Sequence, residues 1–503
     1  MRVAAARGRG RLDPVVAGAL ATIISMAGAS RPSFWFDEAA TISAASRSLE
    51  QLTRLLGNID AVHGGYYLLM HAWFTASPPT EFWSRAPSGV AVGLAAAGVV
   101  MLSRQFSCRS VAMASGITFA LLPRVTWAGI EARPSALSAM AAVWVTVLLV
   151  VAARRGTVWL WTAYALAMVV SMTLDVYLVL MVGVHAAVMW VFRGRRSSIH
   201  FIASIAIALV IIAPFIALAH GQIHQLNWIE PLGAHTVIDV GVKQYFDRSV
   251  PFAILAGLIV AAGLVLRHRG AMTQANGERQ LIIVAVAWMA IPTVSTLLYS
   301  VTVVPIYYPR YLCFTAPGLA ILLGVCVVSI AKTPARVGAV LALLAVAALP
   351  NYLYGQRGAY SKYGMDYSRV ADVITRYAAP GDCLLLDDTV SWRPGPIRPL
   401  VAARPAAYRD LVDVGLGERA TSIDQLWDTN IAPFVVADRI DRCAVLWTIS
   451  ERDPTVPKHE VGVAIPPGPR FATANAFWVP RELGFRLVER WQFNLAQVIK
   501  ATR

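Results

Sequence analysis

The sequence predicts a polytopic α-helical membrane protein of about 11 transmembrane helices, followed by a C-terminal extracytoplasmic α/β domain. Composition is the first observation: 57% of the residues are hydrophobic and only 15% are charged, whereas soluble globular proteins carry about 25% charged residues. The second is the recurrence of long apolar stretches along residues 1–350, and the third is the change to a soluble-type composition over residues 351–503. The chain is therefore expected to divide near residue 350.

Eleven apolar segments have about the length, 16 to 21 residues, that a helix needs to cross a bilayer. The N-terminal segment has the basic start and apolar core of a signal peptide, and we interpret it as an uncleaved first span. Residues 64–74 are apolar but too short to span, so we expect them to lie in the interface or to re-enter the membrane. The expected spans are residues 12–29, 86–103, 108–127, 135–153, 157–174, 176–192, 199–219, 251–266, 281–301, 312–331 and 335–350.

The loops between these spans alternate in charge. Every second connection is basic and nearly free of acids, whereas the opposite set, which includes residues 30–85, 220–250 and 302–311, mixes acids with bases. Because Lys and Arg concentrate on the cytoplasmic side, we expect a multi-pass plasma-membrane protein with a cytoplasmic N-terminus and with residues 30–85 and 351–503 outside. The net charge of +15 is spread over these short basic loops, so it does not indicate a nucleic-acid partner.

Residues 351–503 combine helical and strand patterns, which is typical of a small α/β domain. Apolar side chains recur at helical spacing in one segment, and short apolar runs bounded by turn residues predict buried strands. The expected elements are a helix over 366–382, a strand over 383–388, a helix over 420–428, a strand over 443–450 and a closing hairpin over 485–500.

Two of the five cysteines, Cys383 and Cys443, each open a predicted strand of this domain. If the two strands are neighbours, the thiols could form a disulfide, because the outer compartment is oxidising. Two free buried thiols are the alternative.

An acidic pair, Asp37 and Glu38, follows the first apolar segment in "SFWFDEAATIS" (33–43). One interpretation is two solvated acids at the start of an interfacial helix, where the helix dipole favours negative charge. Two features favour a functional site. The preceding aromatic residues are typical of the membrane interface, and successive helical residues diverge by about 100°, so only one acid of the pair can point into a shared cavity. The same loop also supplies His63, Tyr66, Tyr67 and His71.

Several segments, in the same order, resemble the GT-C superfamily of integral membrane glycosyltransferases. The resemblance is to the branch of the protein mannosyltransferases, the aminoarabinose lipid A transferases and their actinobacterial mannosyltransferase-like relatives. "FWFDEAAT" (34–41) and "DAVHGGYYLLMHAWF" (60–74) resemble the first outer loop of that branch. "GIEARPSALSAM" (129–140) resembles the Arg-containing entry to a later span, and "YYPRYLCFTAPGLAILLG" (307–324) resembles an Arg-Tyr-Leu signature. The resemblance covers about residues 15–330 and implies a GT-C catalytic domain within residues 1–350.

The chain departs from the family pattern at one place. The family often has two prolines after the first-loop histidine, whereas Gly64 and Gly65 follow His63. The loop should be more flexible there, which puts a role for His63 in doubt.

The resemblance implies an inverting glycosyltransferase that moves a sugar from a polyprenyl-phosphate carrier to a lipid-linked or polymeric glycan, a glycolipid or a protein of the cell envelope, on the outer face of the membrane. Mannose is the favoured sugar, and arabinose, glucose or galactose fits the same residues. By match to the family, Asp37 is the base that accepts the proton of the acceptor hydroxyl, and Glu38 orients a neighbour or the acceptor. The leaving phosphate needs no proton, so one carboxylate suffices. We expect no metal or other cofactor, although a divalent cation could bind at Asp37 and Glu38.

A leaving phosphate requires cations, and three side chains in the outer loops are candidates for the donor phosphate: Arg310, Arg133 and Lys243. Arg310 follows a Pro-Tyr-Tyr-Pro turn, and its planar fork suits phosphate oxygens; alternatively, it anchors a helix end at the membrane surface. Arg133 could instead form a loop ion pair with Glu131. The expected substrate-binding residues are His63, Tyr66, Tyr67 and Tyr311.

Two other classes of function stay open. A transporter or flippase for a lipid-linked sugar would be expected to show paired half-repeats, broken helices and charges at mid-membrane, whereas the charges here lie at the outer ends of spans. The other is a non-catalytic envelope assembly protein that has kept the fold. Neither the acceptor, the role of residues 351–503 nor the oligomeric state follows from the sequence.

Overall fold

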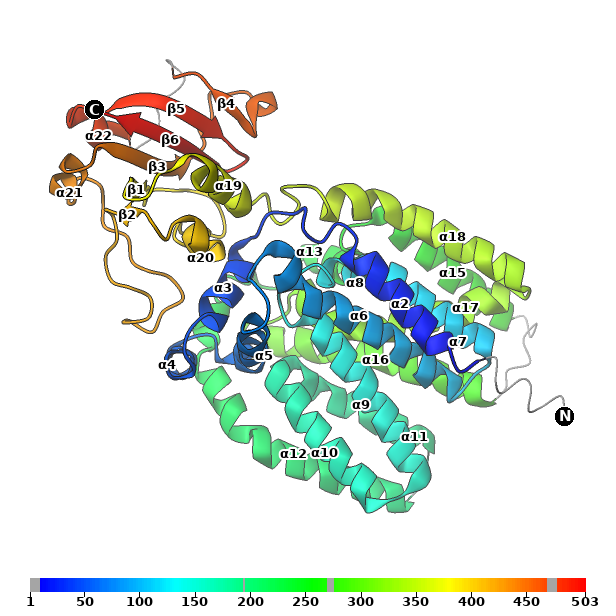
Figure 1. Ribbon diagram of the computed structural model, residues 1–503. Coiled ribbons are helices and arrows are strands. Elements are labelled where there is room, and N and C mark those ends of the chain that lie inside the picture. The colour runs from blue at the N-terminus through cyan, green and yellow to red at the C-terminus, as the bar shows by residue number, and fades with distance from the viewer. Residues whose placement is uncertain (1–9, 193–194, 269–275, 468–476) are drawn as a thin grey trace. The chain divides into compact units, whose positions relative to one another are not determined.

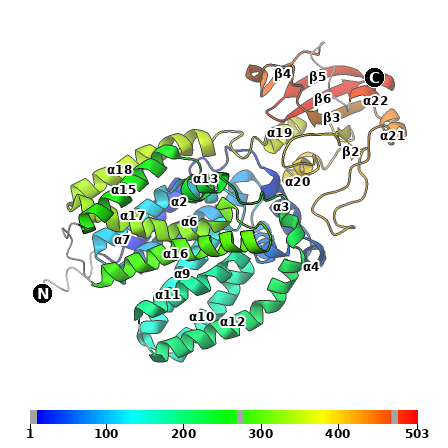
Figure 2. The same cartoon turned by 180° about the vertical axis from the view of Figure 1, so that it is seen from behind.

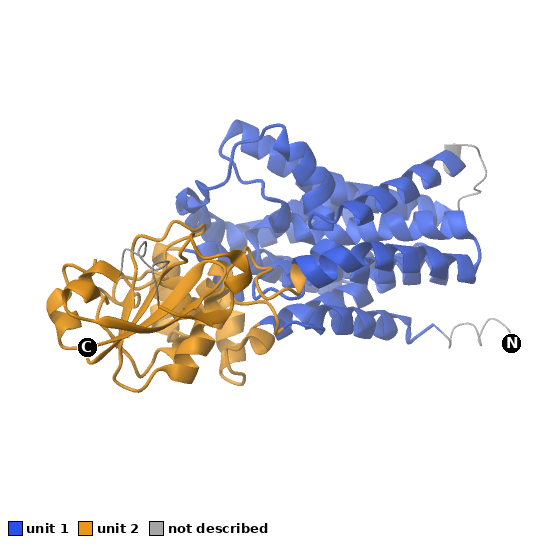
Figure 3. Ribbon diagram, turned by 90° about the horizontal axis from the view of Figure 1, so that it is seen from above, with its two compact units in different colours: residues 1–29, 60–66, 85–355 blue, residues 30–59, 67–84, 356–503 orange. Residues whose placement is uncertain are grey.

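The computed structural model describes residues 10–192, 195–268, 276–467 and 477–503, and the predicted cytoplasmic placement of residues 1–9 falls outside this part. The chain forms two compact units. One comprises residues 1–29, 60–66 and 85–355, and we call it the membrane unit. The other comprises residues 30–59, 67–84 and 356–503, and we call it the outer unit (Figure 3). We call residues 356–503 the C-terminal domain.

The membrane unit is a bundle of helices, and every one of the eleven predicted spans lies on helical segments (Figure 1). The predicted polytopic helical class is confirmed. Its helices are α2 (Asp13–Met26), α6 (Glu81–Arg104), α7 (Arg109–Leu121), α8 (Pro123–Ala128), α9 (Ser135–Arg155), α10 (Val158–Leu174), α11 (Met181–Phe192), α12 (Arg195–Gly221), α13 (His235–Ile238), α14 (Gln244–Phe246), α15 (Val250–His268), α16 (Asn276–Thr302), α17 (Ala316–Ala331) and α18 (Pro334–Pro350).

Six helices in the described residues are long and apolar enough to cross a membrane, or seven if the bent pair His235–Phe246 and Val250–Leu266 is one span. The other predicted spans are shorter or broken. The segment 108–127 is divided between α7 and α8, because Pro123 lacks the backbone N–H that a continuous helix would need.

The packing of the membrane unit centres on α17, which contacts α7, α15, α16 and α18. Gly324 of α17 lies against Ser115 of α7, where a Cβ atom would collide with the serine. Small residues at such a crossing let two apolar helices approach closely. In Figures 1 and 2, α9, α10, α11 and α12 lie together in the same bundle.

The C-terminal domain contains a six-stranded sheet of order β2-β1-β3-β6-β5-β4. β1 pairs in parallel with β2 and β3, and the remaining pairs are antiparallel. The two predicted strands and the closing hairpin are confirmed by β1, β3, β5 and β6. The elements are α19 (Tyr367–Tyr377), β1 (Cys383–Leu386), α20 (Pro399–Ala403), β2 (Val412–Asp413), α21 (Ala437–Asp441), β3 (Val445–Glu451), β4 (Val463–Ile465), α22 (Trp478–Glu482), β5 (Arg486–Gln492) and β6 (Ala496–Thr502).

The helix predicted over residues 420–428 is wrong, because this segment forms turns. The Asp428 carboxylate accepts a hydrogen bond from the backbone N–H of Ala420, at 2.7 Å. Asp424 adopts a left-handed backbone conformation, with φ 49°. Aspartate tolerates that conformation and competes for backbone hydrogen bonds, and both properties work against a helix.

The two cysteines named above are joined. Cys383 and Cys443 form a disulfide, with their Cα atoms 6.0 Å apart. The sequence predicts this disulfide only if the two strands are neighbours, and β1 and β3 are indeed adjacent parallel strands. Among the described residues, Cys108, Cys313 and Cys326 are not part of this disulfide.

Asp366, just before α19, is a buried acid that gives the C-terminal domain a pH-dependent stability. Its carboxylate accepts hydrogen bonds from the N–H groups of Leu495 and Ala496, at 2.7 and 2.8 Å. Burial nevertheless raises the pKa of Asp366 from 3.8 to about 6. The folded state therefore holds this proton more tightly than the unfolded state, so the contribution to stability is greatest below about pH 4 and is lost as the pH rises towards about 6.

We expect Asp366→Asn to remove this dependence, because asparagine keeps an acceptor oxygen but does not ionise. Relative to the wild type, the variant should gain about 2 to 3 kcal/mol between pH 4 and pH 7. Thermal unfolding of the purified protein in detergent, followed across that range for both proteins, measures the difference. A stability difference that does not change with pH would contradict the prediction.

Candidate active site

The acidic pair lies in the first turn of α3 (Phe36–Ala45), which we call the acid-bearing helix. Trp35 is extended and precedes the helix, and the two acids stand at its N-terminus, where the dipole favours them. The side chain of Glu38 is fully buried and Asp37 is half-buried. The interpretation as two solvated acids is therefore wrong for Glu38.

The aromatic residues in front of the acids form part of a protein core. Phe34 and Trp35 are buried in one hydrophobic cluster with Met365 and Tyr367. The ring of Trp35 also stacks on Tyr363, with 4.5 Å between centroids. The prediction of an interfacial aromatic belt is therefore wrong for Phe34 and Trp35, which fasten the acid-bearing helix to the C-terminal domain.

Arg310 lies in a short helix, η5 (Pro309–Thr315), of the membrane unit and is buried. Its guanidinium carbon is 5.1 Å from the ring centroid of Tyr308 and 5.6 Å from that of Tyr311. Two aromatic faces thus hold the planar group by cation–π contacts. Tyr311 also contacts Tyr177, with 5.5 Å between ring centroids.

Arg133 is buried and bonded to His63, which lies in the 3₁₀ helix η1 (Ala61–His63). The Nη2 atom of Arg133 is 2.6 Å from Nε2 of His63. Arginine only donates, so the ring nitrogen of His63 is the acceptor in this contact. His63 thus contacts a predicted phosphate-binding residue, although the flexible Gly-Gly sequence had put its role in doubt.

Lys243 ends a π-helical turn, η4 (Asp239–Lys243). Its Nζ atom is 2.6 Å from a carboxylate oxygen of Asp239. Its carbonyl oxygen accepts hydrogen bonds from Arg124, whose Nη2 atom lies 2.6 Å away. Arg124 also forms an ion pair with Asp247, at 3.0 Å, and is buried.

Sequence reasoning missed Arg124 because it was counted inside an apolar span. The signal was present, since an arginine within a hydrophobic segment is costly and marks a functional candidate. The elements that carry Arg124, Lys243 and Arg310 contact one another: η5 touches α8 and η4. The structure thus groups three cationic residues in one region of the membrane unit.

The remaining predicted residues lie on α5 (Gly64–Phe74), a helix shared between the two units. Tyr66 and Tyr67 are both fully buried; Tyr66 belongs to the membrane unit and Tyr67 to the outer unit. Asp37 and Glu38 also belong to the outer unit, so the meeting of acids and cations at one site stays a prediction.

The described residues contain no group of three or more His, Cys, Asp or Glu side chains placed to hold a metal ion. Asp37 and Glu38 are consecutive in a helix, so their side chains diverge by about 100° around its axis. This divergence disfavours coordination of one ion by both carboxylates. Metal independence stays a prediction.

The bundle of apolar helices and the small C-terminal sheet have the fold of a helical membrane protein with an appended α/β domain, and in this fold the chain resembles solved GT-C structures. The chain is similar in structure to ArnT from Cupriavidus metallidurans in the apo state, with a TM-score of 0.56, 13% identity and 97% of each chain covered. It is also similar to the same protein bound to undecaprenyl phosphate, with a TM-score of 0.55, 14% identity and 97% of each chain covered. No protein-family model and no curated protein sequence matches it.

Proposed function

We propose that the protein is an inverting glycosyltransferase that uses a polyprenyl-phosphate-linked sugar. The observation that carries this proposal is the likeness, over 97% of both chains, to an ArnT structure bound to undecaprenyl phosphate. Arg310, whose planar fork suits phosphate oxygens, supports it, and its element contacts those that carry Arg124 and Lys243, which are paired with Asp247 and Asp239.

In the proposed reaction, the acceptor hydroxyl attacks the anomeric carbon from the face opposite the phosphate. A new bond forms between the acceptor oxygen and the anomeric carbon as the bond to the phosphate oxygen breaks, so the configuration inverts. Asp37 takes the hydroxyl proton, which makes the oxygen a competent nucleophile. Arg310 stabilises the negative charge that develops on the departing polyprenyl phosphate.

The proposed donor is a polyprenyl-phosphate mannose, and the proposed acceptor is a glycan, glycolipid or protein of the cell envelope. We place the reaction on the outer face of the plasma membrane, with the N-terminus in the cytoplasm and the C-terminal domain outside. The Cys383–Cys443 disulfide supports this side of the membrane, since disulfides persist in oxidising compartments.

The proposal is tested with the purified protein in vesicles, a radiolabelled polyprenyl-phosphate mannose and a cell-envelope glycan fraction as acceptor. Label should move from the lipid into the acceptor fraction. Parallel assays with the arabinose, glucose and galactose donors identify the sugar. Carrier that crosses the bilayer without losing its sugar would overturn the proposal in favour of a flippase.

A further inference from the structure

The acid-bearing helix and the C-terminal domain belong to one compact unit, although more than 300 residues of chain separate them. α3 has only 10 residues and no side-chain cap at its N-terminus. Isolated helices shorter than about 12 to 15 residues are marginal in water. The helix that carries Asp37 therefore owes its position to tertiary contacts, and these contacts are identifiable.

The first contact fixes the N-terminal end of the acid-bearing helix. The backbone N–H of Phe34 donates to Oγ of Ser368, at 2.9 Å. In return, the backbone N–H of Ser368 donates to Oγ of Ser33, at 2.9 Å. Ser33, Phe34 and Ser368 are all buried, so water cannot replace these two hydrogen bonds. The pair sits three to four residues before Asp37.

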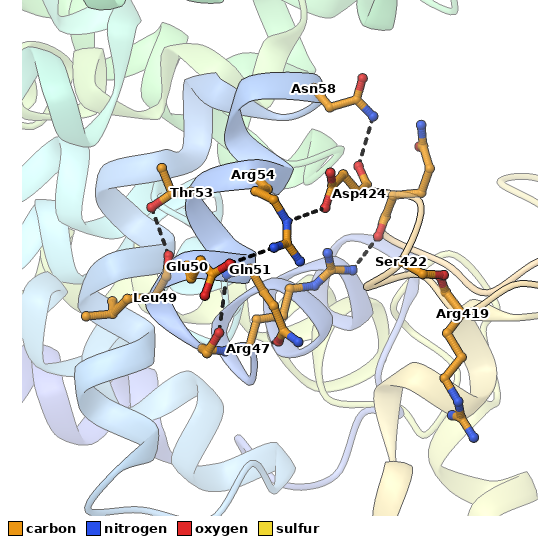
Figure 4. A network of polar contacts seen from close by, with 12 residues as sticks. Arg47, Leu49, Glu50, Gln51, Thr53, Arg54, Asn58, Arg419, Ser422 and Asp424 are labelled. Carbon is orange, nitrogen blue, oxygen red and sulfur yellow. Dashed lines mark hydrogen bonds and ion pairs between the residues drawn. The ribbon is translucent and has the colours of Figure 1, made fainter.

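The second contact fixes the other end of α3 and the following helix α4 (Leu49–Asn58). Ser43 Oγ donates to the carbonyl of Leu426 at 2.6 Å, and Arg47 donates to the carbonyl of Gln425. Figure 4 shows Arg47, Arg54 and Asn58 directed at this segment of the C-terminal domain.

Asp424 is the acidic residue in that contact. Arg54 forms an ion pair with its side chain at 3.2 Å, and Asn58 Nδ2 donates to its carbonyl at 2.9 Å. The left-handed conformation of Asp424 belongs to a tight turn that presents both groups to α4. Residues 420–428, which form turns and not the expected helix, are thus the segment of the C-terminal domain that contacts α4.

The third contact lies near residue 84, where the chain passes from the outer unit into the membrane unit. Arg404, just after α20, forms an ion pair with Glu81 at 2.6 Å and with Asp372 of α19 at 3.5 Å. α20 also packs directly against α3. The C-terminal domain therefore contacts residues 30–85 at three places: just before α3, at the end of α3 and along α4, and at Glu81.

We infer that the C-terminal domain is the positioning element for the proposed catalytic base, Asp37, and that Ser368 is a positioning residue that sets the register of the acid-bearing helix through Ser33 and Phe34. The inference rests on the proposed function. General-base catalysis requires the carboxylate within hydrogen-bond reach of the acceptor hydroxyl, and a displacement of about 1 Å can cost about 100-fold in rate.

The test uses the full-length protein with Ser33→Ala/Ser368→Ala. Amide hydrogen exchange should become about tenfold faster in residues 36–45, because two buried hydrogen bonds are lost, and should stay unchanged in β1 and β3. The turnover number for sugar transfer should fall at least tenfold while KM for the donor changes less than about twofold. Ser368→Thr, which keeps a hydroxyl at this position and leaves Ser33 in place, should match the wild type in both measurements.

Ser391→Ala is the matched control, because Ser391 Oγ donates to Glu451 at 2.7 Å within the C-terminal domain and not to the loop. It should alter neither exchange in α3 nor turnover. Unchanged exchange in residues 36–45 of the double variant would overturn the inference. Faster exchange with normal turnover would also overturn it. Absence of transfer in the wild type would refute the proposed function instead, while hydrogen exchange still decides whether Ser368 holds the helix.

Discussion

Asp37→Asn should lower the turnover number of sugar transfer by about 1,000-fold, because a positioned general base contributes roughly 100- to 10,000-fold to such a reaction. Asparagine has nearly the same size and can still hydrogen-bond, but it does not take up the proton of the acceptor hydroxyl. Asp37 is half-buried at the start of a helix that is held at both ends, so the fold should survive the change. The measurement is transfer of labelled sugar from the polyprenyl-phosphate donor under single-turnover conditions.

Glu50→Gln is the control for this variant. Glu50 lies on α4 of the same loop, is exposed, and pairs with Arg54 at the surface, where an ion pair contributes little. We expect its transfer rate to stay within about twofold of the wild type. If Asp37→Asn retains more than a tenth of the wild-type rate, the general-base role of Asp37 is wrong.

Arg310→Ala should lower kcat/KM for the polyprenyl-phosphate donor by about 100- to 1,000-fold, which is the usual cost of removing one donor aimed at developing charge. Arg310 lies buried between Tyr308 and Tyr311, an arrangement that orients its planar fork. Arg310→Lys keeps the charge but not the paired, planar donors, so it should recover only part of the loss. Initial rates measured over a range of donor concentrations give kcat/KM for both variants.

The competing interpretation of Arg310 is a helix-end anchor. Arg336 provides the comparison, because it is exposed in the first turn of α18, at the end of an apolar helix. Arg336→Ala should leave the donor kinetics unchanged. Equal behaviour of Arg310→Ala and Arg336→Ala, with normal transfer in both, would favour the anchor and remove Arg310 from the site.

Local patterns allowed correct predictions of the helical membrane class and of the strands β1, β3, β5 and β6, and they left the pairing of Cys383 with Cys443 as one of two alternatives, which the structure decides in favour of the disulfide. These features depend on hydropathy and periodicity over about ten to twenty residues. Hydropathy did not show which of the predicted spans are single long helices in the described residues, because breaks such as Pro123 leave hydropathy nearly unchanged.

The candidate site was predictable only in part, for a different physical reason. Asp37, Glu38 and Arg310 could be proposed from the sequence because their residue types stand out at the ends of apolar segments and match the family, and their roles stay predictions. The roles of Phe34, Trp35 and Ser368 depend on contacts across more than 300 residues, which no local pattern encodes. The residue types placed the aromatic pair at the membrane interface, because a buried protein core and a membrane interface both accept tryptophan and phenylalanine.

The bond between Ser33 and Ser368 spans 335 residues, and it has a consequence for how the protein is made. At about 5 to 20 residues per second, the ribosome delivers Ser368 roughly twenty to seventy seconds after Ser33. During that interval the membrane helices are expected to insert, but the segment that bears Asp37 still lacks its contacts with the C-terminal domain. Under the proposed function and topology, we expect a nascent chain to gain transfer activity only after its C-terminal domain has been translocated. A premature stop codon after α18 should then give a protein that inserts into the membrane but does not transfer sugar.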